Sequence, residues 1–236
     1  MTNDHIINLL NEKSEGRPIE EVLRILVAEH EGKVVFTSSF GIEDQVITDY
    51  IFRNDIPVKV VTLDTGRLFE ETYKTYNRTL EKYTKPIVPY FPKHEAVEKM
   101  LQEKGPFSFY SSIENRKECC NIRKVEPLAR ALEGMEIWIT GLRASQSENR
   151  SNLSLFNYDG GFAIIKYNPL LHWSLDECRR YVNENNVPYN VLHDRGFVSI
   201  GCAPCTRAIQ PGEDFRAGRW WWEDNSKKEC GLHTHS

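Results

Sequence analysis

Four of the six cysteines in this 236-residue chain fall in two short groups whose spacing suits metal binding. Cys119 and Cys120 are adjacent, and Cys202 and Cys205 form a C-x-x-C pair. Four thiolates from two segments make a complete ligand set for zinc or an iron–sulfur cluster. Zinc usually takes two spaced pairs, whereas a cubane spreads its ligands, so the spacing favours one [4Fe–4S] cluster per chain. The alternatives are a redox pair at the C-x-x-C and a chance pair of core cysteines at 119 and 120.

The remaining two cysteines have different surroundings. Cys178 lies on the apolar side of a helical pattern that Ser174 caps, which predicts a buried core thiol. Cys230 lies in the polar stretch KKECGLHTHS (227–236), which has neither a helical nor a strand period. We therefore expect a mobile C-terminal segment, 220–236, in which a free thiol is either an accident or a reactive group.

Basic residues gather in the loops around these cysteines. Each could be a solvated surface charge, the commonest fate of arginine. In loops that follow strands, however, planar guanidiniums suit bidentate binding of phosphate or sulfate. The candidates are Arg123, Lys124, Arg143, Arg150, Arg216 and Arg219. The three tryptophans that follow, 220–222, fit no regular period and are interpreted as packing that anchors this loop.

Composition excludes several classes of protein. A hydrophobic share of 40% predicts a globular chain, and the net charge of −4 gives no reason to expect nucleic acid as a partner. No apolar run reaches the length of a membrane span, and MTNDHIINLLNEK lacks the layout of a signal peptide. We expect a cytoplasmic protein without membrane contact, whose cysteines are thiols or metal ligands.

Apolar strands alternate with helical patterns through most of the chain. This alternation predicts an α/β, Rossmann-like parallel sheet with helices on both faces and ligands at the carboxyl ends of the strands. From about Asn186 the pattern fails, and we expect a single domain over 1–219 that ends in irregular structure. The predicted strands are 34–39, 58–65, 86–91, 136–142 and 162–170, and the predicted helices include 44–52, 68–83 and 94–105.

Two polar turns follow the first two predicted strands. In SSFGIED (38–44), small hydroxyl residues and a glycine let backbone N–H groups face an anion at a helix N-terminus. The alternative is a serine-rich turn that merely starts a helix, with Glu43 and Asp44 complementing its dipole. LDTG (63–66) places a second polar turn at the same edge of the sheet. Two such turns side by side favour a nucleotide.

In their order, seven motifs of the chain resemble those of the sulfonucleotide reductases, and more narrowly the assimilatory adenosine 5′-phosphosulfate reductases. The resemblance runs from about Val34 to His233, and the paired cysteines with ECGLH are its most specific features. It implies an adenine nucleotide alpha hydrolase-like fold and a thioredoxin-dependent reduction of adenosine 5′-phosphosulfate to sulfite and AMP. Ala144, Ser145 and Lys228 depart from the usual pattern. The motifs are SSFGIED, LDTG, CCNIRKVEPL, GLRASQSENR, PYNVLHDRGFVSIGCAPCTR, PGEDFRAGRWWWED and KKECGLH.

The resemblance implies a role for the tail. Cys230 is the expected nucleophile, which attacks the sulfonate sulfur and becomes a cysteine S-sulfonate before thioredoxin or glutaredoxin releases sulfite. The cluster, on Cys119, Cys120, Cys202 and Cys205, is not expected to pass electrons. The expected substrate-binding residues are Ser38, Ser39, Phe40, Gly41, Leu63, Thr65, Arg123, Lys124, Gly141, Arg150, Arg216, Arg219 and His233.

Other functions stay open on the sequence. The substrate could instead be 3′-phosphoadenosine 5′-phosphosulfate, although reductases of that compound generally lack both cysteine pairs. An ATP-dependent sulfur-transfer enzyme of the pyrophosphatase-loop type usually needs a second glycine where Phe40 stands. A zinc-stapled nucleotide-binding module would leave Cys230 without a purpose. A homo-oligomer is possible, and the sequence leaves its size undetermined.

Overall fold

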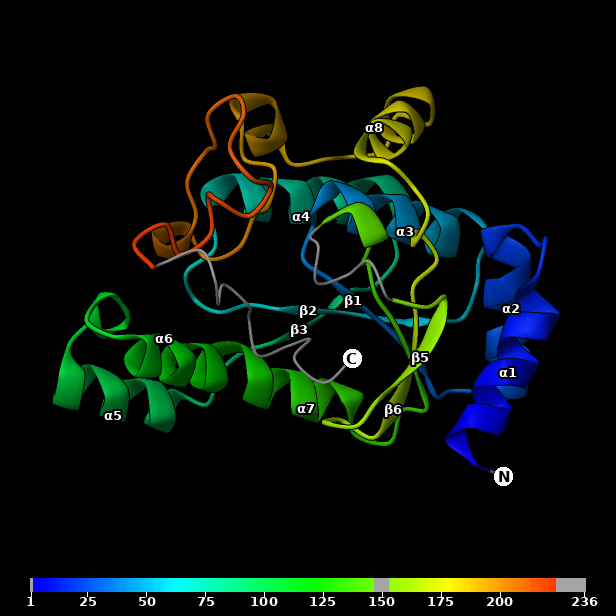
Figure 1. The fold of residues 1–236 in the computed structure, drawn as a ribbon, viewed down its shortest axis with the longest axis horizontal. Helices are drawn as coiled ribbons and strands as arrows, with labels where there is room; N and C mark the ends of the chain where they lie inside the picture. The colour runs from blue at the N-terminus through cyan, green and yellow to red at the C-terminus, as the bar shows by residue number, and fades with distance from the viewer. Residues whose placement is uncertain (1, 147–152, 224–236) are drawn as a thin grey trace.

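The computed structural model describes residues 2–146 and 153–223, whose centre is a six-stranded sheet (Figure 1). The strands are β1 (Val34–Ser38), β2 (Lys59–Leu63), β3 (Val88–Tyr90), β4 (Ile137–Ile139), β5 (Phe156–Asp159) and β6 (Ile164–Tyr167). They lie in the order β3-β2-β1-β4-β6-β5. All neighbouring pairs are parallel except β5 and β6. The carboxyl ends of β1, β2 and β4 therefore meet at one edge, as predicted.

Both faces of the sheet are buried, and successive strand residues supply the two faces in turn. Phe36 and Ile139 belong to a large apolar cluster, whereas Val35 and Trp138 belong to a smaller one that includes Leu128. This division follows from the two-residue period of a strand, which points alternate side chains to opposite faces. The strands are nearly continuously apolar because both faces of the sheet are buried under other elements.

Helices form the two covering layers (Figure 1). The large cluster is completed by α1 (Asn3–Ser14), α2 (Ile19–Glu29), α3 (Ile42–Arg53), α4 (Glu70–Tyr83) and α8 (Leu175–Glu184). The opposite face is covered by α7 (Glu126–Leu132). Two further helices, α5 (His94–Lys104) and α6 (Ile113–Cys120), precede α7 and lie on its side of the sheet in Figure 1.

The predicted helices and the predicted core cysteine are confirmed. Ser174 and Glu177 form a reciprocal capping box at the start of α8, and Cys178 is fully buried in the large cluster. Burial raises the pKa of the Cys178 thiol to about 12, as expected for an inert core cysteine. Our sequence interpretation did not include α1 and α2, which cover the end of the sheet beside β5 and β6.

The wholly parallel sheet that we expected needs one correction, because β5 runs antiparallel to β6 at the edge. β5 is held to β6 by local contacts. Phe156 stacks on Tyr167 with ring centroids 4.7 Å apart. Asp159 and Lys166 form an ion pair that is completely buried. A strand of four residues has too few positions to show a period, which is why this hairpin was not recognised.

After α8 the described chain has little regular structure, as predicted. Two short 3₁₀ turns, at Val191–Arg195 and Ala203–Cys205, interrupt a segment that crosses the carboxyl ends of the strands. Trp220 is almost completely buried and Trp222 packs against the same cluster, which confirms the predicted anchoring for these two, whereas Trp221 is exposed and does not fit the prediction. No helix in the described part of the chain is long and apolar enough to cross a membrane.

Candidate functional site at the carboxyl ends of the strands

A cavity of about 240 Å³ opens at the carboxyl ends of β1, β2 and β4. It brings together most of the predicted substrate-binding residues, which come from three strand-end turns, from the helical segment after α6 and from the C-terminal loop. The members of the predicted set that line it are Ser38, Ser39, Gly41, Leu63, Thr65, Lys124, Gly141, Arg216 and Arg219. Their convergence is the consequence of a parallel sheet that collects its loops at one edge.

The turn after β1 is closed by its own hydrogen bonds. The backbone N–H and the hydroxyl of Ser39 both donate to Asp44 Oδ2, each at 2.6 Å. Burial raises the pKa of the Asp44 carboxyl to about 7, although the bonds from Ser39 oppose the shift. Phe40, a predicted substrate-binding residue, has a φ of 59° and stacks on Tyr76 in the core. The structure therefore does not bring the Phe40 side chain into the cavity.

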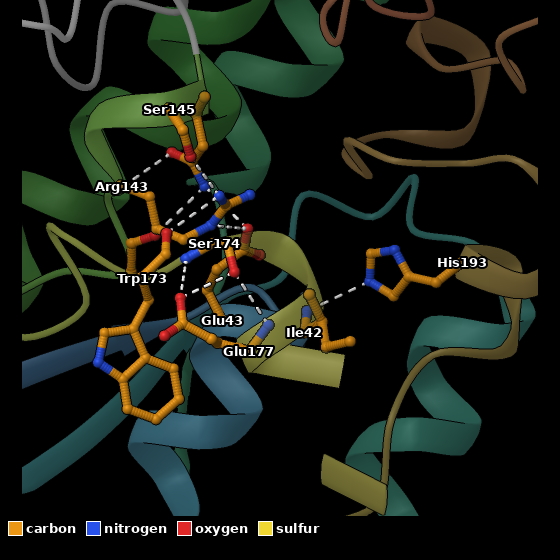
Figure 2. Close-up of polar contacts among 10 residues, drawn as sticks. Ile42, Glu43, Arg143, Ser145, Trp173, Ser174, Glu177 and His193 are labelled. Carbon is orange, nitrogen blue, oxygen red and sulfur yellow. Dashed lines mark hydrogen bonds and ion pairs between the residues drawn. The ribbon is translucent and has the colours of Figure 1, made fainter. Parts of the chain in front are cut away.

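His193 is a residue of the cavity that our sequence analysis missed. The backbone N–H of Ile42, at the start of α3, donates to His193 Nε2 at 3.2 Å, and Nδ1 lies 2.9 Å from Phe197 O (Figure 2). Since an N–H only donates and a carbonyl only accepts, the imidazole must be neutral with its proton on Nδ1. Burial lowers the His193 pKa, which favours this form. The only signal in the sequence was its place in the LHDRG motif.

A buried ion pair joins the turns after β1 and β4. Arg143 Nε donates to Glu43 Oε1 at 2.9 Å, and the Arg143 side chain is 2% exposed (Figure 2). Arg143 Nη1 also donates to Ser145 Oγ at 2.6 Å, and Gln146 Nε2 donates to the same Glu43 oxygen at 3.0 Å. Arg143 is thus a structural cation and not a free anion-binding group.

Gly141 is required where these turns approach each other. A Cβ atom at this position would overlap Asp44 Oδ1 and would meet Glu43 Cβ at 3.3 Å. Asp44 cannot move aside without giving up its bonds from Ser39. The predicted importance of this glycine therefore has a steric cause, the close approach of two loops.

The LDTG turn after β2 connects the cavity with the cysteines. Asp64 Oδ1 accepts from the N–H of Gly66 at 2.8 Å and closes the turn. The Cys202 thiol lies 3.3 Å from Thr65 Oγ1, and Arg123 Nη1 donates to Thr65 O at 2.6 Å. Thr65 thus contacts residues from both sides of the site.

Two cations of the predicted set have different positions. They lie on a π-helical turn, Asn121–Val125, which joins α6 to α7 and widens the helix by one residue. Lys124 lines the cavity, whereas Arg123 lies outside its lining and faces the cysteines. π-turns of this kind are frequent at functional sites.

The C-terminal loop supplies the remaining cations of the cavity. Arg219 is 5% exposed, and its Nε has no hydrogen-bond partner among the described residues. Its guanidinium packs directly on Gly201, where a Cβ atom would overlap it. Arg216 lies beside it in the lining. A buried guanidinium fixed in this way is ready to bind an anion.

The four predicted metal-ligating cysteines line one small pocket next to the cavity. Cys119 and Cys120 end α6, Cys202 directly precedes the 3₁₀ turn at Ala203–Cys205, and Cys205 is the last residue of that turn. Burial raises the pKa of Cys119, and raises that of Cys205 to about 12. In residues 2–146 and 153–223, no three His, Cys, Asp or Glu side chains form a group that could hold a metal ion.

Three predicted residues, Arg150, Cys230 and His233, lie outside the described residues. The described chain ends at Glu223, whose carboxylate accepts two bonds from Arg116, at 2.8 and 2.9 Å. Arg116 is 1% exposed, so the point at which the tail begins is firmly held. The predicted catalytic cysteine is seven residues further along the chain.

Comparison with known proteins places the chain among the enzymes that it resembles. The family model of the phosphoadenosine phosphosulfate reductase domain matches residues 33–208. The chain belongs to this family. The matched range contains both cysteine pairs and the turns after β1, β2 and β4, and it ends before Arg216.

Several relatives of this family member match nearly its whole length. An adenosine 5′-phosphosulfate reductase of Sinorhizobium fredii strain NGR234 is 50% identical over 95% of this chain and 89% of its own. The protein of the same name from Neisseria meningitidis serogroup B is 46% identical over 95% of this chain and 90% of its own.

Solved structures agree on the fold of this family member. A phosphoadenylyl-sulfate reductase from Candida auris, in a phosphate complex, superposes with a TM-score of 0.75 at 31% identity, over 89% of this chain and 98% of that one. Candida glabrata FMN adenylyltransferase has a TM-score of 0.54 at 14% identity, over 93% of this chain and 80% of that one. The second likeness concerns the fold alone.

Proposed function

We propose that this chain reduces adenosine 5′-phosphosulfate to sulfite and AMP, with electrons from a protein dithiol. The observation that carries the proposal is one cavity lined both by polar strand-end turns and by Lys124, Arg216 and Arg219. A nucleotide phosphosulfate has matching chemistry, because its base and ribose are neutral and its other end is anionic. The names of the relatives that are about half identical support this substrate.

The cations would make the sulfonate a target for a thiolate. Anionic oxygens around the sulfur repel a negatively charged nucleophile, so positive charge at that end of the cavity lowers the barrier. Arg219 is suited to this role, because its guanidinium is buried and held against Gly201 before any ligand arrives. The fixed position avoids reorganisation during the reaction.

Cys230 would be the nucleophile. Its thiolate sulfur forms a bond to the sulfonate sulfur while the bond between that sulfur and the phosphate oxygen breaks, and AMP leaves with the electron pair. The product is a cysteine S-sulfonate. An external thiolate then attacks the Cys230 sulfur, sulfite leaves with an electron pair, and a second thiol of the reductant restores Cys230. The two electrons come from the dithiol, which ends as a disulfide.

We also propose that Cys119, Cys120, Cys202 and Cys205 hold a [4Fe–4S] cluster. Four cysteine thiols from two segments, three of them buried, line one pocket and supply the complete soft-ligand set of such a cluster. When bound, the cluster would tie α6 to the C-terminal loop and alter the electrostatic potential beside Lys124. Lys124 lines both the pocket and the cavity, so a changed potential in the pocket would act on the substrate through this cation.

A single-turnover experiment tests the reaction. Enzyme mixed with adenosine 5′-phosphosulfate and no reductant should release AMP in an amount equal to the enzyme. One sulfonate should appear on a peptide that contains Cys230. Cys230→Ser should bind the nucleotide and form no adduct, with activity lower by several orders of magnitude. Cys178→Ser is the matched control, because this thiol is buried in the core away from the cavity.

Other outcomes of the same assay separate the alternatives. An adduct on Cys202 or Cys205 would contradict the role of Cys230. Comparable kcat/KM for adenosine 5′-phosphosulfate and its 3′-phosphorylated form would overturn the substrate preference. A requirement for ATP and Mg²⁺ would identify a pyrophosphatase-loop enzyme instead.

The remaining expectations concern the setting of the reaction. We propose thioredoxin or glutaredoxin as the reductant and the cytoplasm as the compartment, where thiols stay reduced. A homo-oligomer stays a prediction, which the mass of the protein in solution tests directly.

A further inference from the structure

A group of aromatic side chains beside the cysteine pocket has three exposed members, while Phe109 is buried beneath them and Trp222 is partly buried. We call it the aromatic patch and define it by five residues, Phe107, Phe109, Tyr110, Trp221 and Trp222. Phe107 is 63% exposed, Tyr110 40% and Trp221 39%, although all are large and apolar. Their rings form a continuous chain of contacts with centroids 4.4 to 6.3 Å apart. Contiguous exposed apolar surface of this kind commonly marks an interaction site.

The patch is attached both to the cysteine pocket and to the start of the tail. Tyr110 Oη donates to Pro204 O at 2.7 Å, between Cys202 and Cys205 in the chain. Trp221 and Trp222 are followed directly by Glu223, which Arg116 holds in a buried bidentate pair. The segment that carries Cys230 therefore begins at the edge of the patch.

The length of this segment limits where Cys230 can be reached. Cys230 is the seventh residue after Glu223, and seven residues of extended chain span at most about 25 Å. Any molecule that attacks the Cys230 sulfur must come within this distance of the patch. The proposed reaction requires such a molecule, because a cysteine S-sulfonate needs an attacking thiol and two electrons.

The described chain does not offer that thiol itself. Cys119, Cys178, Cys202 and Cys205 are buried, and Cys120 is only partly accessible, so none of the described cysteines is exposed. A thiol from another molecule is therefore needed at this side of the protein.

We propose that the aromatic patch is the docking surface for the protein dithiol that reduces the Cys230 adduct. The inference rests on the proposed function and adds the place where its reductant binds. The fitting partner has an apolar surface around its reactive cysteine, since flat aromatic rings gain most from contact with apolar groups. The tail itself is a poor occupant, because KKECGLHTHS is polar and charged.

The test compares a protein reductant with a small one. Phe107→Ser combined with Trp221→Ser removes two exposed rings and leaves the Tyr110 hydroxyl bond in place. We expect the KM for thioredoxin to rise at least tenfold. The rate with saturating dithiothreitol should be unchanged, since a small dithiol needs no docking surface. Leu9→Ser is the matched control, because Leu9 is 37% exposed on α1, at the other end of the molecule in Figure 1.

Three outcomes would overturn the inference. The first is a double variant with an unchanged KM for thioredoxin. The second is equal loss of rate with thioredoxin and with dithiothreitol, which would mean that the rings support the tail or the cavity. The third is a changed mass in solution with unchanged KM, which would make the patch a contact between copies of this chain. The AMP burst without reductant distinguishes these outcomes from a failure of the proposed function. If the proposed function is wrong, the unmodified protein gives no burst.

Discussion

The strand-end cavity and the cysteine pocket are neighbours that differ in chemistry. The cavity is lined by turns that satisfy their own polar groups, as Ser39 does with Asp44 and as the N–H of Ile42 does with His193. The cysteine pocket is lined by thiols and by the cations Arg67, Arg116, Arg123 and Lys124, and burial raises the pKa of the Cys205 thiol to about 12. The polar groups of the first region are paired with one another, whereas the thiols of the second region lie beside positive charge, which favours their thiolate form.

The two regions are nevertheless coupled through two residues. Thr65 accepts from Arg123 through its carbonyl and lies against the Cys202 thiol through its hydroxyl. Lys124 lines both regions. A substitution in the cysteine pocket is therefore expected to alter nucleotide binding in the cavity. The large apolar cluster that α3 completes should keep its structure.

The largest effect is expected from breaking the cysteine pocket. Cys205→Ser should lose bound iron and lower kcat/KM at least about 100-fold, because Lys124 and the C-terminal loop would lose their common support. Iron analysis and sulfite release measure the two effects. Cys178→Ala, which removes a core thiol of the same kind, should keep its iron. Full activity of Cys205→Ser with zinc alone would contradict the proposed cluster.

The cavity should instead respond to pH through Asp44. The pKa of this carboxyl in the folded protein, about 7, lies above its ordinary value of 3.8 because the group is buried. The stability that its neutral form contributes is therefore complete below pH 3.8 and is lost as pH rises through about 7. Asp44→Asn does not titrate, so its free energy of unfolding relative to the unmodified protein should improve by about 2 kcal/mol between pH 5 and pH 8. Urea unfolding at both pH values measures this difference, and an equal difference at both would contradict the prediction.

A steric change should affect the cavity alone. Gly141→Ala places a methyl group against Asp44 and should weaken nucleotide binding by about 10- to 100-fold, as overpacking costs of about 1–3 kcal/mol imply. Calorimetry with AMP measures the affinity, and iron content should stay normal. Gly160→Ala is the control, because nothing lies within 4 Å of the added carbon. Parallel loss of iron would show that the two regions are less separate than their contacts indicate.

The smallest effect is expected where the regions meet. Thr65→Val removes the hydroxyl that contacts Cys202 and accepts from the N–H of Arg67. One neutral hydrogen bond is worth about 1 kcal/mol, so we expect roughly a fivefold loss of kcat/KM. Thr65→Ser keeps the hydroxyl and should lose less. Equal losses in both variants would assign the effect to the methyl group and not to the hydrogen bond.

Much of this protein could be predicted from its sequence, because the signals are local. The strands at 34–39 and 58–65 are apolar runs, and the polar turns that follow them must meet at one sheet edge in any parallel arrangement. The helical pattern and cap around Cys178 likewise depend on residues a few positions apart. The irregular chain after Asn186 was visible as the loss of any period.

Only the tertiary structure decided which side chains meet across long separations. Arg143 pairs with Glu43 and not with a ligand, Arg123 faces the cysteines, and Phe40 packs into the core. His193 contacts the start of α3 from a loop far away in the sequence, and no motif spacing predicts this contact. An arginine or histidine has the same local pattern whether it binds substrate or a buried partner, so its role depends on the burial and charge that the completed fold places beside it.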